Sequence, residues 1–244
     1  MGAPLDLLFL GSGNAFATGR YWSSFLLNDR YLFDAAPTVQ PHLKRAGVAL
    51  DEIECVFVSH FHADHFLGLP FLILEYDERT KRERDFTILG PPGIEERLRA
   101  VTDAAYPSLM DDDRSYDLRF VELGDGATGT FGNLTYLGRS VVHSADLECF
   151  GLRIEVGGRT LAYSGDSMLC DALVELAEGA DVFVVECSNW ERPSSLHMNL
   201  DDIRELRRRL GPTPTFVLTH LDAGAPALDI ENTLLAEDLA GLSL

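Results

Sequence analysis

One short run of residues constrains this chain more than any other feature: Ser59-His60-Phe61-His62-Ala63-Asp64-His65. It follows the apolar, strand-like Cys55–Val58 and precedes the helix-like Phe66–Leu69. In an extended segment alternate side chains point to the same side, so the first two histidines face one point. The turn into the helix brings the aspartate and the last histidine back to a neighbouring point. The run therefore predicts a strand-to-helix loop that serves two metal ions.

Three further ligand candidates stand at the ends of other strand-like segments: His143 after Ser140–Val142, Asp166 within Tyr163–Ser167, and His220 at the end of Phe216–His220. Each is weak evidence by itself, because a lone Gly-Asp turn is usually only a turn. Together with the first run they complete a nitrogen and oxygen donor set for two ions. Imidazole and carboxylate ligands suit zinc, manganese and iron(II) without any cysteine. We expect two divalent metal ions, with Zn²⁺ favoured over Mn²⁺ and Fe²⁺.

These motifs resemble the metallo-β-lactamase superfamily, and more narrowly its tRNase Z-like and phosphodiesterase-like branch. The resemblance runs from Leu5 to about His220, and the first run fits the HxHxDH signature. The other matching segments are Phe9–Ala15 followed by Arg20 and Ser23-Ser24, Leu32-Phe33-Asp34, His143, Gly165-Asp166-Ser167 and His220. The resemblance implies a metal-dependent hydrolase.

The resemblance also assigns roles to individual residues. One metal is expected on His60, His62 and His143 and the second on Asp64, His65 and His220, with Asp166 bridging the two. Asp34 is expected to fix the tautomer and orientation of a ligating histidine. An ordinary aspartate at the end of a strand is the alternative interpretation of Asp34.

His197 and Glu186 resemble a pair in the tRNase Z-like branch, where a strand-end Glu precedes a histidine that protonates the leaving oxygen. An imidazole with a pKa near neutrality suits such an acid, and Glu186 would orient it and keep it protonated. A helix-capping or interface histidine is the alternative. With the metal ligand Asp64, these two are the residues expected to take part in catalysis.

Several features depart from the tRNase Z pattern. Ala35-Ala36-Pro37 stand where the family usually has glycines, Met198 replaces a threonine, and Leu221–Gly224 lacks a Ser/Arg/Tyr run. No long Gly/Pro- and Lys-rich insertion that could grip tRNA is visible. The 20 basic and 39 acidic residues give a net charge of −19, which opposes binding of a long polyanion. Two bound dications would still attract a small anion, so long nucleic acids are not expected as partners.

Strand-like and helix-like segments alternate along the chain, which predicts one domain over residues 1–244. The expected class is α/β (α+β): a four-layer αββα metallo-β-lactamase sandwich of two mixed sheets flanked by helices. The expected strands are 5–10, 22–27, 31–33, 55–58, 86–89, 118–121, 133–137, 149–156, 160–163, 182–185 and 215–218, and the expected helices are 39–46, 67–75, 94–104, 171–177 and 200–210. The charged stretch Asp77–Asp85 is expected to form a solvated face or loop, with a basic lip over the active site as the alternative.

The leading functional hypothesis is a phosphodiesterase that acts on a small phosphodiester or cyclic nucleotide. A metal-bridging hydroxide would attack in line, and His197 would protonate the departing alkoxide. A lactone, ester or thioester hydrolase is the first alternative, because the same cage polarises a carbonyl. A metal-binding protein of the same fold without turnover is the second.

The expected cellular location follows from three features of the sequence: the lack of a membrane-spanning run, the lack of a signal peptide and the scattered cysteines. The sequence has no apolar run of about 18 residues that would span a membrane, and Met1–Pro4 lacks the features of a signal peptide. The four cysteines are scattered and indicate reduced thiols. We expect a cytoplasmic protein with a small-molecule substrate. The resemblance places Arg20 and Trp22 near the mouth of the site, where they are candidates for substrate contacts, and packing in the core is the alternative for Trp22. Homodimerisation is expected from the superfamily resemblance and from the apolar tail Ala225–Leu244.

Overall fold

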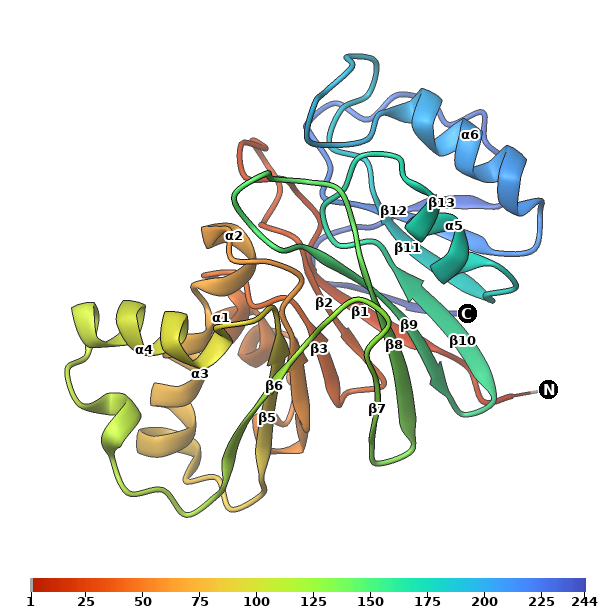
Figure 1. Cartoon of the computed structure of the whole chain (residues 1–244). Coiled ribbons are helices and arrows are strands. Elements are labelled where there is room, and N and C mark those ends of the chain that lie inside the picture. Colours follow the sequence, from red (N-terminus) through yellow and green to blue (C-terminus); the bar gives the residue numbers. More distant parts are fainter. Residues whose placement is uncertain (1) are drawn as a thin grey trace.

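A computed structural model describes residues 2–244 and shows two seven-stranded sheets (Figure 1). In sheet order, the first consists of β14 (Ala240–Ser243), β1 (Asp6–Gly11), β2 (Ser24–Leu27), β3 (Tyr31–Phe33), β4 (Cys55–Phe57), β5 (Phe86–Gly90) and β6 (Leu118–Glu122). The second consists of β13 (Thr233–Leu235), β12 (Thr215–Thr219), β11 (Val182–Glu186), β10 (Arg159–Tyr163), β9 (Phe150–Val156), β8 (Leu134–Ser140) and β7 (Thr128–Phe131). The predicted pair of sheets is confirmed.

Each sheet is antiparallel in one half and parallel in the other. Strands β14, β1, β2 and β3 pair antiparallel, whereas β3 to β6 pair parallel. In the second sheet β7 to β10 pair antiparallel and β10 to β13 parallel. In an open sheet, ligand sites lie outside the carboxyl ends of parallel strands. The carboxyl ends of β3, β4, β10, β11 and β12 are therefore the places to look for a site.

Helices cover the outer face of each sheet and complete the four layers (Figure 1). Near the first sheet lie α1 (Val39–Arg45), α2 (Ala63–Phe66), α3 (Leu69–Leu74), α4 (Ile94–Ala105), the 3₁₀ turns η1 (Leu50–Glu52) and η3 (Leu109–Asp111), and the π-helical η2 (Glu75–Thr80). The second sheet carries α5 (Asp171–Ala177) and α6 (Leu200–Leu210). No helix within residues 2–244 is both long and apolar enough to cross a membrane.

The strands are apolar on both faces because each sheet packs against the other sheet on one side and against helices on the other. Leu7 and Phe9 of β1 pack between the sheets, while Leu10 packs under the helices of the first sheet. In β4, Phe57 likewise faces the other sheet and Val56 faces the helices. A strand covered on both sides buries successive residues in two cores, which rigidly fixes the loops that follow it.

All eleven predicted strands and five predicted helices are present; β3, α5 and α6 have the predicted bounds, and the other elements have shifted ends. Strands β7, β13 and β14 and the short helix α2 were not predicted. The apolar tail is used within the chain, because β13 pairs with β12 and β14 pairs with β1. Homodimerisation stays a prediction that the tail no longer motivates.

The prediction of a solvated segment at Asp77–Asp85 is wrong for Arg82, whose side chain is 1% exposed. The guanidinium donates to the backbone oxygens of Leu50, Asp51, Ile53, Arg84 and Asp85. It also lies over the rings of Tyr76 and Phe86, at 4.7 and 5.2 Å from their centroids. We call this arrangement the Arg82 cluster. It closes the turn that follows η2 and leaves no donor of the guanidinium free.

Candidate metal centre

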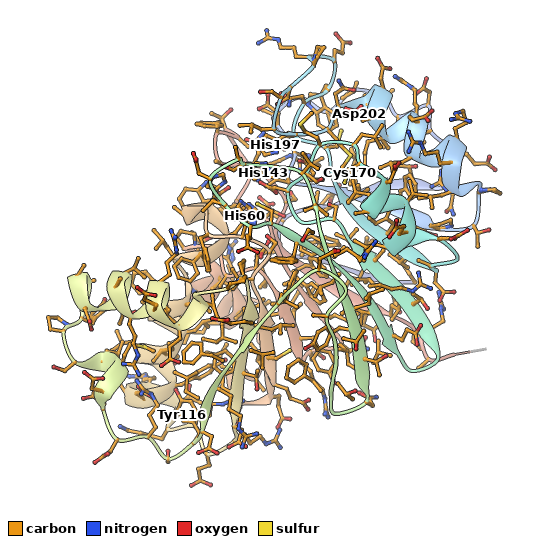
Figure 2. The ribbon with its side chains drawn as sticks, in the orientation of Figure 1. His60, Tyr116, His143, Cys170, His197 and Asp202 are labelled. Atoms are coloured by element: carbon orange, nitrogen blue, oxygen red, sulfur yellow. The ribbon has the colours of Figure 1, made fainter. Side chains whose placement is uncertain are left out.

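The predicted ligands come together at the carboxyl ends of strands from both sheets. His60 and His62 follow β4, His143 follows β8, Asp166 follows β10, and His220 follows β12. Figure 2 shows the labelled His60, His143 and His197 at this end of the molecule, where loops of both sheets meet. The site is thus assembled from strand ends that are fixed by the core beneath them.

The donor atoms form two compact groups. In the first, His60, His62 and His143 offer nitrogens within 4.8 Å of one another, and His62 Nδ1 lies 3.1 Å from His143 Nε2. In the second, Asp64, His65 and His220 lie within 3.3 to 3.4 Å of one another. Tetrahedral ligands about 2.1 Å from a zinc ion stand about 3.4 Å apart. Both groups therefore have the spacing of metal ligands.

Asp166 lies between the two groups. Its Oδ2 is 3.3 Å from the Nε2 atoms of His65 and His220 and 3.9 Å from those of His60 and His143. Gly165 makes this position possible, because it has a φ of +57° and an added Cβ would meet the Phe150 oxygen at 2.7 Å. Asp166 is therefore the carboxylate within reach of the imidazoles of both groups.

One observation indicates directly that the cluster could hold a cation. His60 Nε2 is buried and has no hydrogen-bond partner within residues 2–244. Burial, assisted by the nearby His65, lowers the pKa of His60 well below its ordinary value. A neutral imidazole then aims a free lone pair into the cluster. A buried acceptor of this kind needs a donor or an ion, and imidazole with carboxylate suits zinc.

The carboxylates of the cluster also call for positive charge. Burial alone would lower the pKa of His65, but Asp166 and Asp34 hold it well above its ordinary value. Burial alone would raise the pKa of Asp64, yet contacts with His220 and His65 hold it below its usual range. No Lys or Arg lines the cavity over the site within residues 2–244. This arrangement fits a metal site.

Hydrogen bonds at the back of the site orient the imidazoles. Asp34 Oδ2 lies 2.7 Å from His65 Nδ1, and Asp34 accepts further hydrogen bonds from Ser59 and Tyr163. Because a carboxylate only accepts, His65 carries its proton on Nδ1 and presents Nε2 to the cluster. His143 does the same by donating from Nδ1 to the Leu196 oxygen at 2.8 Å.

Backbone strain accompanies this orientation at two positions. Asp34 and His220 have φ values of +56° and +55°, in the left-handed region that side chains with a Cβ rarely adopt. Their side-chain hydrogen bonds hold them there, and His220 Nδ1 lies 2.6 Å from Ser188 Oγ. Strain maintained by a surrounding network is typical of functional sites.

Glu186 connects the metal cluster to His197. Its Oε1 lies 2.8 Å from His197 Nδ1, and its Oε2 accepts from Ser188 Oγ at 2.9 Å. Ser188 in turn contacts His220, so one buried carboxylate holds both histidines. Burial by itself would lower the pKa of His197, but the hydrogen bond and charge of Glu186 raise it. The pair therefore favours an imidazole that carries a proton.

The sequence did not point to Ser59, Tyr163 and Ser188 as parts of the site. Ser188 stands two positions after Glu186 near the end of β11, so strand alternation is a signal that places both on one side. Tyr163 gave no comparable signal, because it reaches Asp34 across 129 positions of sequence. Arg20, expected near the substrate, instead donates to Ser12 and to the Ala236 oxygen.

The family follows from the fold, the cluster and a sequence match. Residues 29–221 match the β-lactamase superfamily domain. The chain belongs to the metallo-β-lactamase superfamily and is related to ribonuclease Z. It is a hydrolase of this fold whose buried His/Asp clusters fit a metal site.

Individual relatives agree with this assignment. Ribonuclease Z of Methanosarcina mazei is 29% identical over 98% of each chain. An uncharacterized protein of Mycobacterium tuberculosis is 35% identical over 75% of this chain and 67% of its own length. Among solved structures, the short form of human tRNase Z has a TM-score of 0.79 at 21% identity, with 98% of each chain covered. A diphosphatase of the PhnP family has a TM-score of 0.77 at 19% identity, with 98% of each chain covered.

Proposed function

We propose that this chain is a metal-dependent phosphodiesterase that acts on a small phosphodiester, with a cyclic nucleotide as the leading candidate. The observation that carries the proposal is the position of the His197–Glu186 pair. His197 Nδ1 lies 2.8 Å from Glu186 Oε1 and 3.9 Å from Asp166 Oδ2. An acid beside a metal-ligand cluster suits a reaction in which an alkoxide departs and needs a proton.

The candidate metal ligands fall into two groups according to the distances between their donor atoms. His60, His62 and His143 would hold one divalent ion, Asp64, His65 and His220 the other, and Asp166 would bridge them. Two ions, with zinc favoured, would activate a water and neutralise charge on the phosphoryl oxygens. Asp34 keeps His65 in the tautomer that this arrangement requires.

His197 supplies the proton in this mechanism. Its Nδ1–H donates to Glu186, which leaves the opposite ring nitrogen, Nε2, for the substrate. As the bond to the leaving oxygen breaks, the Nε2 proton passes to that oxygen and the imidazole becomes neutral. Glu186 raises the pKa of His197 and so keeps the ring protonated before the reaction. Dications bound nearby would lower the pKa of His197, so the Glu186 carboxylate would be needed to keep the ring protonated.

The site supports a small substrate better than tRNA. The ribonuclease Z and PhnP relatives support chemistry at a phosphodiester or a related phosphoryl bond. A cavity of about 510 Å³ lies over the cluster, and no Lys or Arg from residues 2–244 lines it. The net charge of −19 opposes the approach of a long polyanion. A small substrate with one phosphodiester group needs no basic residues beyond the metals and is repelled less by the net negative charge.

Metal content and turnover in one preparation test the proposal. We expect about two metals per chain by mass spectrometry and hydrolysis of bis-nitrophenyl phosphate in preference to a simple lactone. Turnover of the lactone alone would favour the carbonyl hydrolase. One metal or fewer, with no turnover after metal is added, would favour a binding protein.

The role of His197 is tested by comparing leaving groups. In His197→Ala, kcat for a diester with an alkoxide leaving group should fall by about 10² to 10⁴, the usual contribution of a general acid. A nitrophenolate leaves without a proton, so its loss should be far smaller. The thermal unfolding temperature serves as the control for folding. Equal losses for both leaving groups would contradict the assignment.

A further inference from the structure

Phe16 is the most exposed large apolar side chain in the part of the chain described, at 90% exposure. It lies in the loop between β1 and β2 and lines the cavity over the metal cluster. The phenylalanines of the two sheets, by contrast, lie in the cores or pack against them. A ring left in water at the mouth of a site suggests that it contacts what enters the site.

The loop that carries Phe16 is firmly held. The Phe16 amide donates to Asn14 Oδ1 at 2.9 Å, and Asn14 Nδ2 donates to the Ser188 oxygen at 3.2 Å. The Asn14 amide donates to the Leu221 oxygen at 3.0 Å. These bonds tie the loop to the strand ends that carry Glu186 and His220. The ring is therefore presented at a fixed place near the reacting groups.

Leu196 supplies a second exposed apolar side chain on the same cavity. It is 41% exposed and comes from the loop before α6. Its oxygen accepts the Nδ1–H of the metal-ligand candidate His143, which fixes its backbone beside the cluster. We call Phe16 and Leu196 the apolar rim. The rim is built from two separate loops, each hydrogen-bonded to the site itself.

The rest of the cavity limits the charge of its occupant. Besides the rim and the candidate metal ligands, its lining includes the uncharged polar residues Asn14, Ser188, Asn189 and Ser194. Arg20 turns away to Ser12. Negative charge on a ligand is thus neutralised only at the metal cluster and the adjoining His197, which suits a single phosphoryl group. The volume of about 510 Å³ falls in the range of small-molecule sites.

We propose that the apolar rim selects phosphodiesters that carry a planar, uncharged ring, and that Phe16 stacks on the face of that ring. A nucleobase linked to one phosphodiester has this chemistry, whereas nucleoside polyphosphates add charge that the cavity does not neutralise. This inference rests on the proposed phosphodiesterase function. Stacking on an aromatic side chain tolerates every base and changes affinity by about five- to a hundredfold per base. The rim therefore recognises that a ring is present and discriminates little between bases.

Two esters with the same leaving group test the inference: thymidine 5′-nitrophenyl phosphate and methyl nitrophenyl phosphate. Wild-type protein should prefer the nucleoside ester. In Phe16→Ala the ratio of kcat/KM for the nucleoside ester to that for the methyl ester should fall by about tenfold, mainly through KM. Phe16→Tyr should retain the ratio, because its ring also stacks. Leu196→Ala should reduce the ratio by a smaller factor.

Phe71→Ala is the matched control, since Phe71 is an exposed ring (43%) on α3 outside the cavity lining. It should leave the ratio unchanged. Hydrolysis of both esters by the wild type with no nucleoside preference, or a preference that survives Phe16→Ala, overturns the inference and leaves the proposed function standing. Hydrolysis of neither ester by the metal-loaded protein overturns both.

Discussion

The metal centre and the Arg82 cluster are both buried and polar, yet they are completed in different ways. Every donor of the Arg82 guanidinium meets a backbone oxygen of the chain. In the metal centre, His60 Nε2 meets none. Figure 2 shows how far Tyr116, whose ring lies 5.9 Å from the Arg82 guanidinium carbon, stands from the labelled histidines. The Arg82 guanidinium, satisfied within the chain, stabilises the fold, whereas the open His60 nitrogen lies among several ligand candidates and marks a place for a ligand.

The largest expected effect tests the open cluster. Asp166→Asn should reduce phosphodiester hydrolysis by more than about 100-fold, the upper end of what loss of an outer hydrogen bond costs a metal site. Metal content should fall below two per chain, because one shared carboxylate oxygen serves both groups. Asp171→Asn is the control, since its side chain is 90% exposed. Full activity with two metals would contradict the bridging role.

The next effect tests the closed cluster. Arg82→Met should lower the free energy of unfolding by about 3 kcal/mol or more, because several buried carbonyls lose their donor. Metal content of the folded protein should stay the same, as measured by mass spectrometry beside denaturant unfolding. Arg84→Met, whose side chain is 55% exposed, should change stability by about 0.5 kcal/mol at most. A loss of metal in Arg82→Met would remove the distinction between the clusters.

A smaller effect is expected where fold and metal centre meet. Asp34→Asn retains the side-chain shape but replaces one acceptor oxygen with a donor facing His65 or Ser59. Metal affinity, measured by competition with a chelator, should fall about 10- to 100-fold. Asp29→Asn is a matched control, because Asp29 is an exposed aspartate with a similar φ of +59°. Unchanged affinity would show that Asp34 does not orient His65.

The smallest effect concerns Glu75, the first residue of η2. Its Oε2 lies 2.6 Å from Lys44 Nζ. Burial alone would raise the pKa of Glu75, but the hydrogen bonds from Lys44 and Gln40 lower it below 4.5. A lowered folded pKa contributes stability above about pH 4.5, and this contribution is lost as the pH falls through the folded pKa. Glu75→Gln should therefore cost about 1 kcal/mol at pH 7 and progressively less in acid. Denaturant unfolding at several pH values measures it; a pH-independent difference would contradict the cause.

The sequence predicted those parts of the molecule that depend on local pattern. The run at His60–His65 combines a strand end with a helix start, and the other ligand candidates stand at similar strand ends. Strand β14 was missed because its partner β1 lies more than 200 positions away, and nothing in Ala240–Ser243 signals that pairing. Arg82 was misjudged for the same reason: its partners from Leu50 to Ile53 are distant in sequence. Long-range contacts, and not residue type, decide both cases.

The carboxylate of Glu186 has a consequence for how such a protein evolves or is redesigned. Because it holds His197 directly and His220 through Ser188, a change that moves the proposed proton donor also disturbs a candidate metal ligand. We therefore expect Glu186, His197 and His220 to change together during evolution, because a substitution at one of them disturbs the others. The side chains of the apolar rim are less constrained, because the hydrogen bonds that hold the two rim loops do not involve them. New specificities in this lineage are expected to arise from substitutions at positions such as 16 and 196, with Glu186, His197 and His220 left intact.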